Sequence, residues 1–318
     1  MTPLLILLAV AFAWSMGAHY TGACMGMPRA LGVLSARSAL LLMAPLCLLG
    51  ATFASHAAQG TVAHGLTTGD LGTGSEVVVV AVAFTLTTLY NWARVPTSTI
   101  QILIFSLLGT ALGVGVGVHW QVVGLLAGVW LLAPLVAACL GFGFTRLLDM
   151  VPHLLMASSA PRWLGLPLVI VGCVASFAMG GNDVVNAAGP LVGAGALSPL
   201  AAGALGGVGL ALGVLTWGRP LLQRVAFDVV RLDPAMATAA QGVQAIVVLV
   251  AVSLGLFTSM NQALIGAMAG AGLARGRNTV RAAMVRGIVR GWVLGPAAGI
   301  ALGYLVSHGL RWDGVQLQ

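Results

Sequence analysis

The sequence contains no lysine and little charge of either sign. Its 14 basic residues are all arginines, it has 7 acids, and charged residues make up only 7% of the chain. Soluble domains carry about 25% charged residues, whereas here 59% of the residues are hydrophobic and the mean hydropathy is +1.03. The shortage of charge therefore excludes an ordinary soluble domain and predicts an integral membrane protein.

Cysteine clusters and catalytic patterns are also missing. The four cysteines (Cys24, Cys47, Cys139 and Cys173) stand singly, with no CxxC pair and no Cys/His cluster, which excludes a disulfide framework and a zinc site. The sequence shows no Ser/His/Asp, HExxH or paired-carboxylate arrangement, so we expect neither an enzyme nor a cofactor. A membrane-embedded enzyme is accordingly disfavoured.

Apolar runs separated by Gly, Pro or Arg predict an all-α integral membrane protein. At roughly 20 residues per span, a chain of 318 residues suits about ten membrane segments and no sizeable soluble domain. The expected segments are 3–27, 37–58, 76–93, 96–118, 120–144, 163–183, 198–217, 236–257, 259–275 and 281–308. Short or re-entrant segments would change this count without changing the class of protein.

The arginines fall on alternate connections. Connections after the odd-numbered segments hold Arg29, Arg37, Arg94, Arg146, Arg162, Arg219, Arg224, Arg231, Arg275, Arg277 and Arg281. Connections after the even-numbered segments hold none, and the C-terminal tail holds Arg311. By the positive-inside rule, this pattern predicts a multi-pass protein of the cell (inner) membrane with both termini outside. The excess of basic residues is then explained by their placement in loops on one side of the lipid bilayer, so we expect no nucleic-acid partner.

The two halves of the chain carry matching polar motifs. MGAHYTGACMG at 16–26 aligns with MGGNDVVNAAG at 179–189, and PTSTIQ at 96–101 aligns with FTSMNQ at 257–262. Coinciding pairs are Met16/Met179, Gly17/Gly180, Gly26/Gly189, Thr97/Thr258, Ser98/Ser259, Gln101/Gln262 and Gly109/Gly270. Five segments per half would invert the second copy, so we expect two inverted five-segment repeats, residues 1–150 and 151–318, with discontinuous helices at mid-membrane. This pattern is typical of secondary transporters.

Asp183 is the carboxylate that lies in the middle of a membrane-length segment. An acid in hydrocarbon costs several kcal/mol, so it is a candidate functional residue. Glycines before it and Gly189-Pro190 after it predict an interrupted helix whose free backbone groups bind ions. Asn182 and Asn186 add amide groups on one face. The alternative for the asparagines is a polar cluster that only packs helices together.

Hydroxyl residues at Thr97, Ser98 and Thr99, and at Thr258 and Ser259, precede two apolar segments. Hydroxyl donors at a helix N-terminus make an anion site, although plain N-capping is the alternative. We expect anion-binding residues at Thr97, Ser98, Thr99, Gln101, Asn182, Asn186, Thr258, Ser259, Asn261 and Gln262. We expect coupling-ion residues at Asp183, His19 and Tyr20, with sodium at Asp183 as the only metal option.

GGNDVVNAAGP at 180–190, VPTST at 95–99 and LIGAMAGAGLARG at 264–276 resemble the signature motifs of the inorganic phosphate transporter (PiT) family. The resemblance covers nearly the whole chain. It implies an inverted-repeat secondary transporter for a tetrahedral oxyanion that forms a homodimer.

The departures from the family pattern concern the first repeat. His19, Tyr20 and Ala23 stand where the family has Asn, Asp and Asn, and Phe257 and Met260 replace a Pro and a Thr. A sodium site that needs an Asp from each repeat would be half dismantled, which favours coupling to protons. GAHYTGACMG and GFGFTRLLD look most like the sulfate-permease (CysP-like) branch.

Sulfate also suits the residue types, since it is fully ionised and needs only donors, whereas phosphate retains protons. Asp183 remains able to accept a phosphate proton, so the sequence predicts a proton-coupled sulfate transporter with phosphate as the alternative and an anion channel as a further class.

Overall fold

The structure is a computed structural model that describes residues 1–93, 97–150, 165–228, 233–276 and 282–312. Within these ranges it is helical apart from turns, loops and one isolated β-bridge between Thr67 and Val118. The helices are α1 (Thr2–His19), α2 (Thr21–Ala30), α3 (Ala36–Phe53), α4 (His56–His64), α5 (Gly72–Ala93), α6 (Thr99–Val114), α7 (Trp120–Met150), α9 (Leu166–Asp183), α10 (Val185–Gly193), α11 (Pro199–Asp228), α12 (Pro234–Ser253), α13 (Met260–Ala274) and α14 (Ala282–Trp312).

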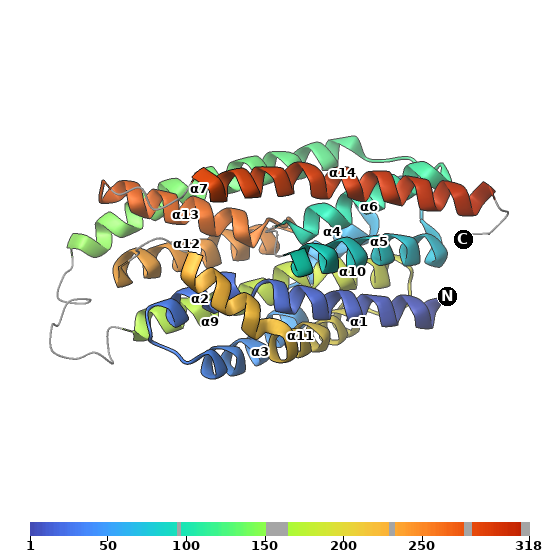
Figure 1. Ribbon diagram of the computed structural model, residues 1–318. Helices are drawn as coiled ribbons and strands as arrows, with labels where there is room; N and C mark the ends of the chain where they lie inside the picture. Colours follow the sequence, from blue (N-terminus) through green and yellow to red (C-terminus); the bar gives the residue numbers. More distant parts are fainter. Residues whose placement is uncertain (94–96, 151–164, 229–232, 277–281, 313–318) are drawn as a thin grey trace.

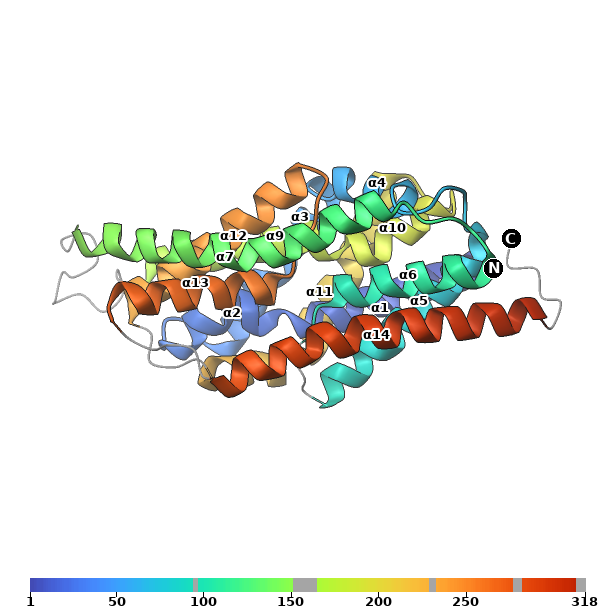
Figure 2. The same ribbon diagram turned by 90° about the horizontal axis from the view of Figure 1, so that it is seen from above.

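The helices form one elongated bundle (Figure 1). Eight stretches of helix in the described ranges are long and apolar enough to cross a membrane. The start of α1 and the end of α14 lie at one end of the bundle, and the ends of α2, α7 and α13 lie at the other (Figures 1 and 2). The all-α membrane fold predicted from the sequence is therefore confirmed, while the number of crossings stays a prediction.

Two of the expected spans appear as helices about half as long as α7 and α14, which have 31 residues each. The segments expected at 96–118 and 259–275 appear as α6, with 16 residues, and α13, with 15 residues. Both begin in the middle of the bundle and run to opposite ends (Figure 2). The hydropathy of the sequence does not reveal these late helix starts, because the Ser and Thr residues before each helix are themselves compatible with a membrane segment. The described helices thus include two discontinuous hairpins, α5–α6 and α12–α13.

The interruptions in the long helices fall close to the expected places. The first membrane stretch breaks at Tyr20 and the stretch from Leu166 to Gly193 breaks at Val184. Gly189 and Pro190 lie inside α10 rather than at the break, so the expectation that they end the helix is wrong. The segment expected at 37–58 also divides, because residues 54 and 55 separate α3 from α4.

Glycines of the two halves make reciprocal backbone contacts. A Cβ on Gly17 in α1 would lie 2.0 Å from the carbonyl oxygen of Leu210 in α11, and a Cβ on Gly180 in α9 would lie 2.0 Å from that of Cys47 in α3. Each partner is 163 positions from its counterpart, since 180 − 17 and 210 − 47 both equal 163. Only glycine allows helices to approach this closely. The glycines that were expected to break α9 therefore pack it instead.

The same reciprocity holds for the half-length helices. A Cβ on Gly109 in α6 would meet the carbonyl oxygen of Ile300 in α14 at 2.2 Å, and a Cβ on Gly270 in α13 would meet that of Ala138 in α7 at 1.8 Å. Helices α6 and α13 thus pack on α14 and α7, each on the last long helix of the other half. This is the packing that two inverted copies require.

The division of the chain at residue 150 stays a prediction, since residues 151–164 lie outside the described ranges. Several residues used in the sequence analysis lie outside them as well: Arg94, Val95, Pro96, Arg162, Arg231, Arg277 and Arg281.

Candidate functional site

Two helix breaks and two helix starts meet at the centre of the bundle. They are the breaks at Tyr20 and Val184 and the first turns of α6 and α13, whose N-cap residues are Ser98 and Ser259. Hydrogen bonds join them: the Tyr20 hydroxyl lies 2.9 Å from Thr99 Oγ1, and Asn186 Nδ2 donates to the same atom at 3.2 Å. Motifs 79 and 87 positions apart in the sequence therefore form one cluster.

Four hydroxyl groups directly before the two helix starts have no partners. Ser98 and Ser259 adopt extended backbone conformations, yet neither side chain makes a capping hydrogen bond. The hydroxyl oxygens of Thr97, Ser98, Thr258 and Ser259 are all buried without a hydrogen-bond partner. Burying such groups unpaired costs free energy, so N-capping, the alternative weighed for these residues, does not account for them. They are available to a ligand.

Two helix dipoles reinforce this arrangement. Because α6 and α13 begin at the centre and run outward in opposite directions (Figure 2), the positive ends of both face the cluster. Free N–H groups and the dipole of a helix N-terminus attract anions. The hydroxyls of Ser98 and Ser259 lie at these two helix ends.

Asn182 uses its side chain to hold the α12–α13 connection. Its Nδ2 donates to the carbonyl oxygen of Thr258 at 2.9 Å, and its Oδ1 accepts from the Thr258 N–H at 3.1 Å. The amide is therefore occupied at both ends by the protein. Asn186 keeps a buried Oδ1 without a partner. The anion-binding roles expected for both residues stay predictions.

Asp183 lies buried at the end of α9, with 1% of its surface exposed. Tyr20 and Asn182 are its polar neighbours, but neither carboxylate oxygen has a hydrogen bond of acceptable geometry. No group of three or more His, Cys, Asp or Glu side chains suited to a metal is found in the described ranges. The acid is thus available to a proton or a monovalent cation.

His19 connects both hairpins. Its Nδ1 hydrogen-bonds Asn91 Oδ1 in α5, whose Nδ2 donates to the carbonyl oxygen of Ser15 at 3.0 Å. Its Nε2 lies 3.4 Å from both the Thr97 carbonyl oxygen and Asn261 Nδ2. Asn91 Oδ1 can only accept, so Nδ1 of His19 carries a hydrogen. In neutral His19 the Nε2 atom therefore accepts from Asn261 Nδ2, whereas in protonated His19 it donates to the carbonyl oxygen of Thr97.

Gln101 and Gln262 lie one turn inside α6 and α13 and contact each other. With the Gln262 amide oriented to satisfy its neighbours, it accepts from Gln101 Nε2 at 3.2 Å and from Trp292 Nε1 at 2.7 Å. Trp130 in α7 is the counterpart of Trp292 in α14, and its Nε1 donates to the Phe257 carbonyl oxygen at 3.1 Å. These glutamines join the two halves, and a direct role in binding an anion stays a prediction.

Several polar residues of the centre were missed in the sequence. Asn91 in α5 and Gln241 and Gln244 in α12 are buried, and Gln241 Nε2 donates to the Ala23 carbonyl oxygen at 2.8 Å. Isolated amides in apolar helices were the available signal. A second buried carboxylate, Glu76 in α5, was also overlooked, because it lies at the edge of its expected segment.

An ion cluster ties helix ends together at the arginine-bearing end of the bundle. Arg275, directly after α13, pairs with Asp149 of α7 and with Asp233, the N-cap of α12. The hydrogen bonds that Arg275 donates to Asp149 and the charge of Asp233 raise the pKa of the Arg275 guanidinium above its ordinary value. The cluster is partly exposed and lies outside the central site.

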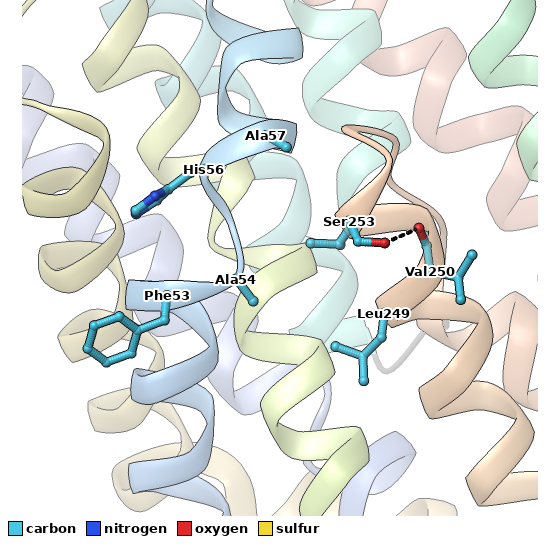
Figure 3. Close-up of a pocket in the computed structure, with 8 residues that line it drawn as sticks. Phe53, Ala54, His56, Ala57, Leu249, Val250 and Ser253 are labelled. Carbon is cyan, nitrogen blue, oxygen red and sulfur yellow. Dashed lines mark hydrogen bonds between the residues drawn. The ribbon is translucent and has the colours of Figure 1, made fainter.

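A separate groove of about 480 Å³ lies between the α3–α4 junction and the last turns of α12 (Figure 3). It is mostly apolar, and Phe53 and Val250 on its rim are exposed. The Ser253 hydroxyl bonds the Val250 carbonyl oxygen at 2.9 Å rather than facing a ligand. No residue expected for anion or coupling-ion binding lines this groove.

Long apolar helices with mid-bundle breaks, and two half-length helices that meet at a polar centre, define a membrane transporter. Comparison with known proteins agrees. The model of the phosphate transporter family matches residues 16–303, so the chain belongs to the phosphate transporter family, as its motifs predicted. Its family and fold are those of transporters and not of enzymes.

The individual relatives differ in coverage. The chain is 28% identical over 280 residues to sulfate permease CysP of Bacillus subtilis, which covers 85% of this chain and 77% of that protein. It is 39% identical over 135 residues to the chloroplastic inorganic phosphate transporter 2-1 of Arabidopsis thaliana, which covers 38% of this chain and 23% of that protein. A solved structure titled the sodium-dependent phosphate transporter matches with a TM-score of 0.87 at 21% identity, covering 98% of this chain and 99% of that one.

Proposed function

We propose that the protein is a secondary active transporter that takes up a tetrahedral inorganic oxyanion, sulfate, together with protons. The observation that carries the proposal is the set of four buried, unpartnered hydroxyls at two opposed helix N-termini. They offer donors and positive helix ends to an anion from both halves of the chain. Asp183, an unpaired acid beside them, offers the charge that a coupling cation neutralises.

The choice of sulfate rests on the donors and on one relative. The groups of the centre without partners are mainly hydroxyl donors, which suit an anion without protons. A relative whose sequence aligns over most of both chains is named a sulfate permease. The other sequence relative described and the solved structure, which matches over most of both chains too, are named phosphate transporters. Phosphate is therefore the second candidate, because Asp183 can accept a proton from it.

His19 and Asp183 are the groups that respond to the coupling ion in this proposal. Protonation of His19 moves the partner of its Nε2 from Asn261 of α13 to the carbonyl oxygen of Thr97 before α6. One proton thus exchanges a contact with the second half for a contact with the first. Tyr20, bonded to Thr99 and next to Asp183, relays the change to the anion site.

Flux into proteoliposomes tests the proposal. Purified protein is given labelled sulfate or phosphate, with each anion as competitor and with proton and sodium gradients imposed separately. We expect sulfate accumulation driven by an inward proton gradient. Stronger uptake of phosphate selects the second candidate, a requirement for sodium refutes proton coupling, and flux that never exceeds equilibrium indicates a channel.

The same proposal places the protein in the cell (inner) membrane as a homodimer, with both termini outside. The alternation of arginines supports the orientation, and the resemblance to the family supports the dimer.

A further inference from the structure

Glu76 is a buried acid that the central site does not use. It lies in the second turn of α5, has 3% of its surface exposed, and its Oε2 is buried without a hydrogen-bond partner. No ion pair or hydrogen bond to Glu76 is present among the described residues. A carboxylate in this position needs a cation or a proton to compensate its burial.

The ends of two other helices surround this carboxylate. A Cβ on Gly193, the last residue of α10, would lie 3.2 Å from Glu76 Oε1 and 3.2 Å from the carbonyl oxygen of Ala63, near the end of α4. Helix C-termini carry partial negative charge. Glu76 therefore lies beside the negative ends of α4 and α10, an environment that favours binding of a positive charge.

The two helix ends beside Glu76 offer no competing charge. Helix α10 has no titratable side chain, and the histidines of α4, His56 and His64, are exposed. Gly193 is only half-buried, so the carboxylate lies just inside the surface. A hard metal cation takes six or so oxygen ligands, whereas one carboxylate and one nearby carbonyl suffice for a proton.

Two helices lead from this position to the centre. Helix α10 begins at Val185, next to the break beside Asp183, and ends at Gly193 beside Glu76, a distance of about 12 Å at 1.5 Å per residue. Helix α5 carries Glu76 near its start and Asn91, the partner of His19, near its end. Both helices lie in the half of the bundle toward the start of α1 (Figure 1).

We propose that Glu76 is a proton-binding site between the end of the bundle where α1 begins and the central acid, and that coupling protons occupy it before reaching Asp183. This inference rests on the proposed function. In the predicted orientation, this end faces the outside.

The test compares wild type with Glu76→Gln, and uses Thr87→Val as the control. Thr87 is buried in the same helix, and its hydroxyl also lacks a partner. Each protein is reconstituted and measured for anion exchange without a gradient and for accumulation driven by an inward proton gradient. We expect Glu76→Gln to keep exchange and lose gradient-driven accumulation, while Thr87→Val keeps both. Accumulation by Glu76→Gln equal to wild type overturns the inference.

A second measurement does not depend on transport or on the stability of Glu76→Gln. Infrared titration of wild type and Asp183→Asn reports the C=O stretch of protonated buried carboxyl groups. We expect one titrating band to survive in Asp183→Asn, since Glu76 is then the remaining buried acid of the described core. Absence of that band at every pH overturns the inference. Absence of anion flux in wild type, with the band present, refutes the proposed function alone.

Discussion

At the scale of single residues, the centre of the molecule is defined by polar atoms without partners. The hydroxyls before α6 and α13 and the Asp183 carboxylate are buried and unpaired, whereas Asn182 and Gln262 are engaged with the protein. The residues with unpaired groups are thus available to a ligand, and the residues with paired groups hold the site in shape.

Replacing Asp183 by Asn removes the charge and keeps the shape of the side chain. We expect coupled uptake to be abolished and expression to be largely intact, because an amide does not titrate and has no negative charge for a coupling cation to neutralise. Accumulation assays in proteoliposomes and the yield of folded protein measure both effects. Full accumulation by this variant would reduce the acid to a packing role.

Replacing Ser98 or Ser259 by Ala removes one of the opposed donors. A hydrogen bond to a charged group contributes about 1.5–3 kcal/mol, so each variant should weaken apparent anion affinity about tenfold or more. Thr110→Val is the control, since Thr110 is buried and unpartnered in α6 but lies far along the helix. Unchanged affinity in both serine variants would move the anion site elsewhere.

The residues of the centre were predictable because polar side chains stand out in an apolar sequence. Their division into roles was not. In the sequence, Gln101 and Gln262 look like ligand residues, because they are polar and lie one turn inside helices that begin at the site. Only the packing of α6 and α13 against α14 and α7 shows that these glutamines bind each other and Trp292. Glu76 was missed because periodicity places it at the edge of a segment, although burial makes it interior.

At the scale of helices, close contact through glycine decides how the halves fit together. The carbonyl oxygens of Leu210, Cys47, Ile300 and Ala138 occupy the space where a side chain would begin. The sequence showed the abundance of glycine and the repeat offset, but it could not assign which helix each glycine touches. It also could not show that α6 and α13 are half-length. A hydropathy pattern gives the length of an apolar segment, but it does not show where within that segment the helix begins.

Gly270→Val should prevent correct packing of α13 on α7. A Cβ there would lie 1.8 Å from the Ala138 carbonyl oxygen, and overpacking of this kind costs about 3 kcal/mol or more. Gly128→Val in α7 is the matched control, since no atom lies within 4 Å of a Cβ at that position. Thermal unfolding in detergent, followed by size-exclusion chromatography, should show a large loss for the first variant alone. Equal stability of the two would contradict the packing.

At the scale of the whole molecule, the arginine pattern predicts which end faces the cytoplasm. The chain has no lysine, so a single introduced lysine can be labelled with an impermeant amine reagent and compared with the parent protein. We expect Asp70→Lys, in the exposed connection between α4 and α5, to react in intact cells. Arg37→Lys, exposed at the start of α3, should react only after permeabilisation. The reverse result would invert the orientation.

The half-length helices also limit how the molecule can move. The first turns of α6 and α13 carry backbone N–H groups that no lipid chain can satisfy, so neighbouring helices must screen them at every moment of a working cycle. Water can therefore be admitted only along the long axis, from one end or the other, and never sideways through the wall of the bundle. Rocking of whole helix groups meets this condition, whereas peeling a single helix away from the rest does not.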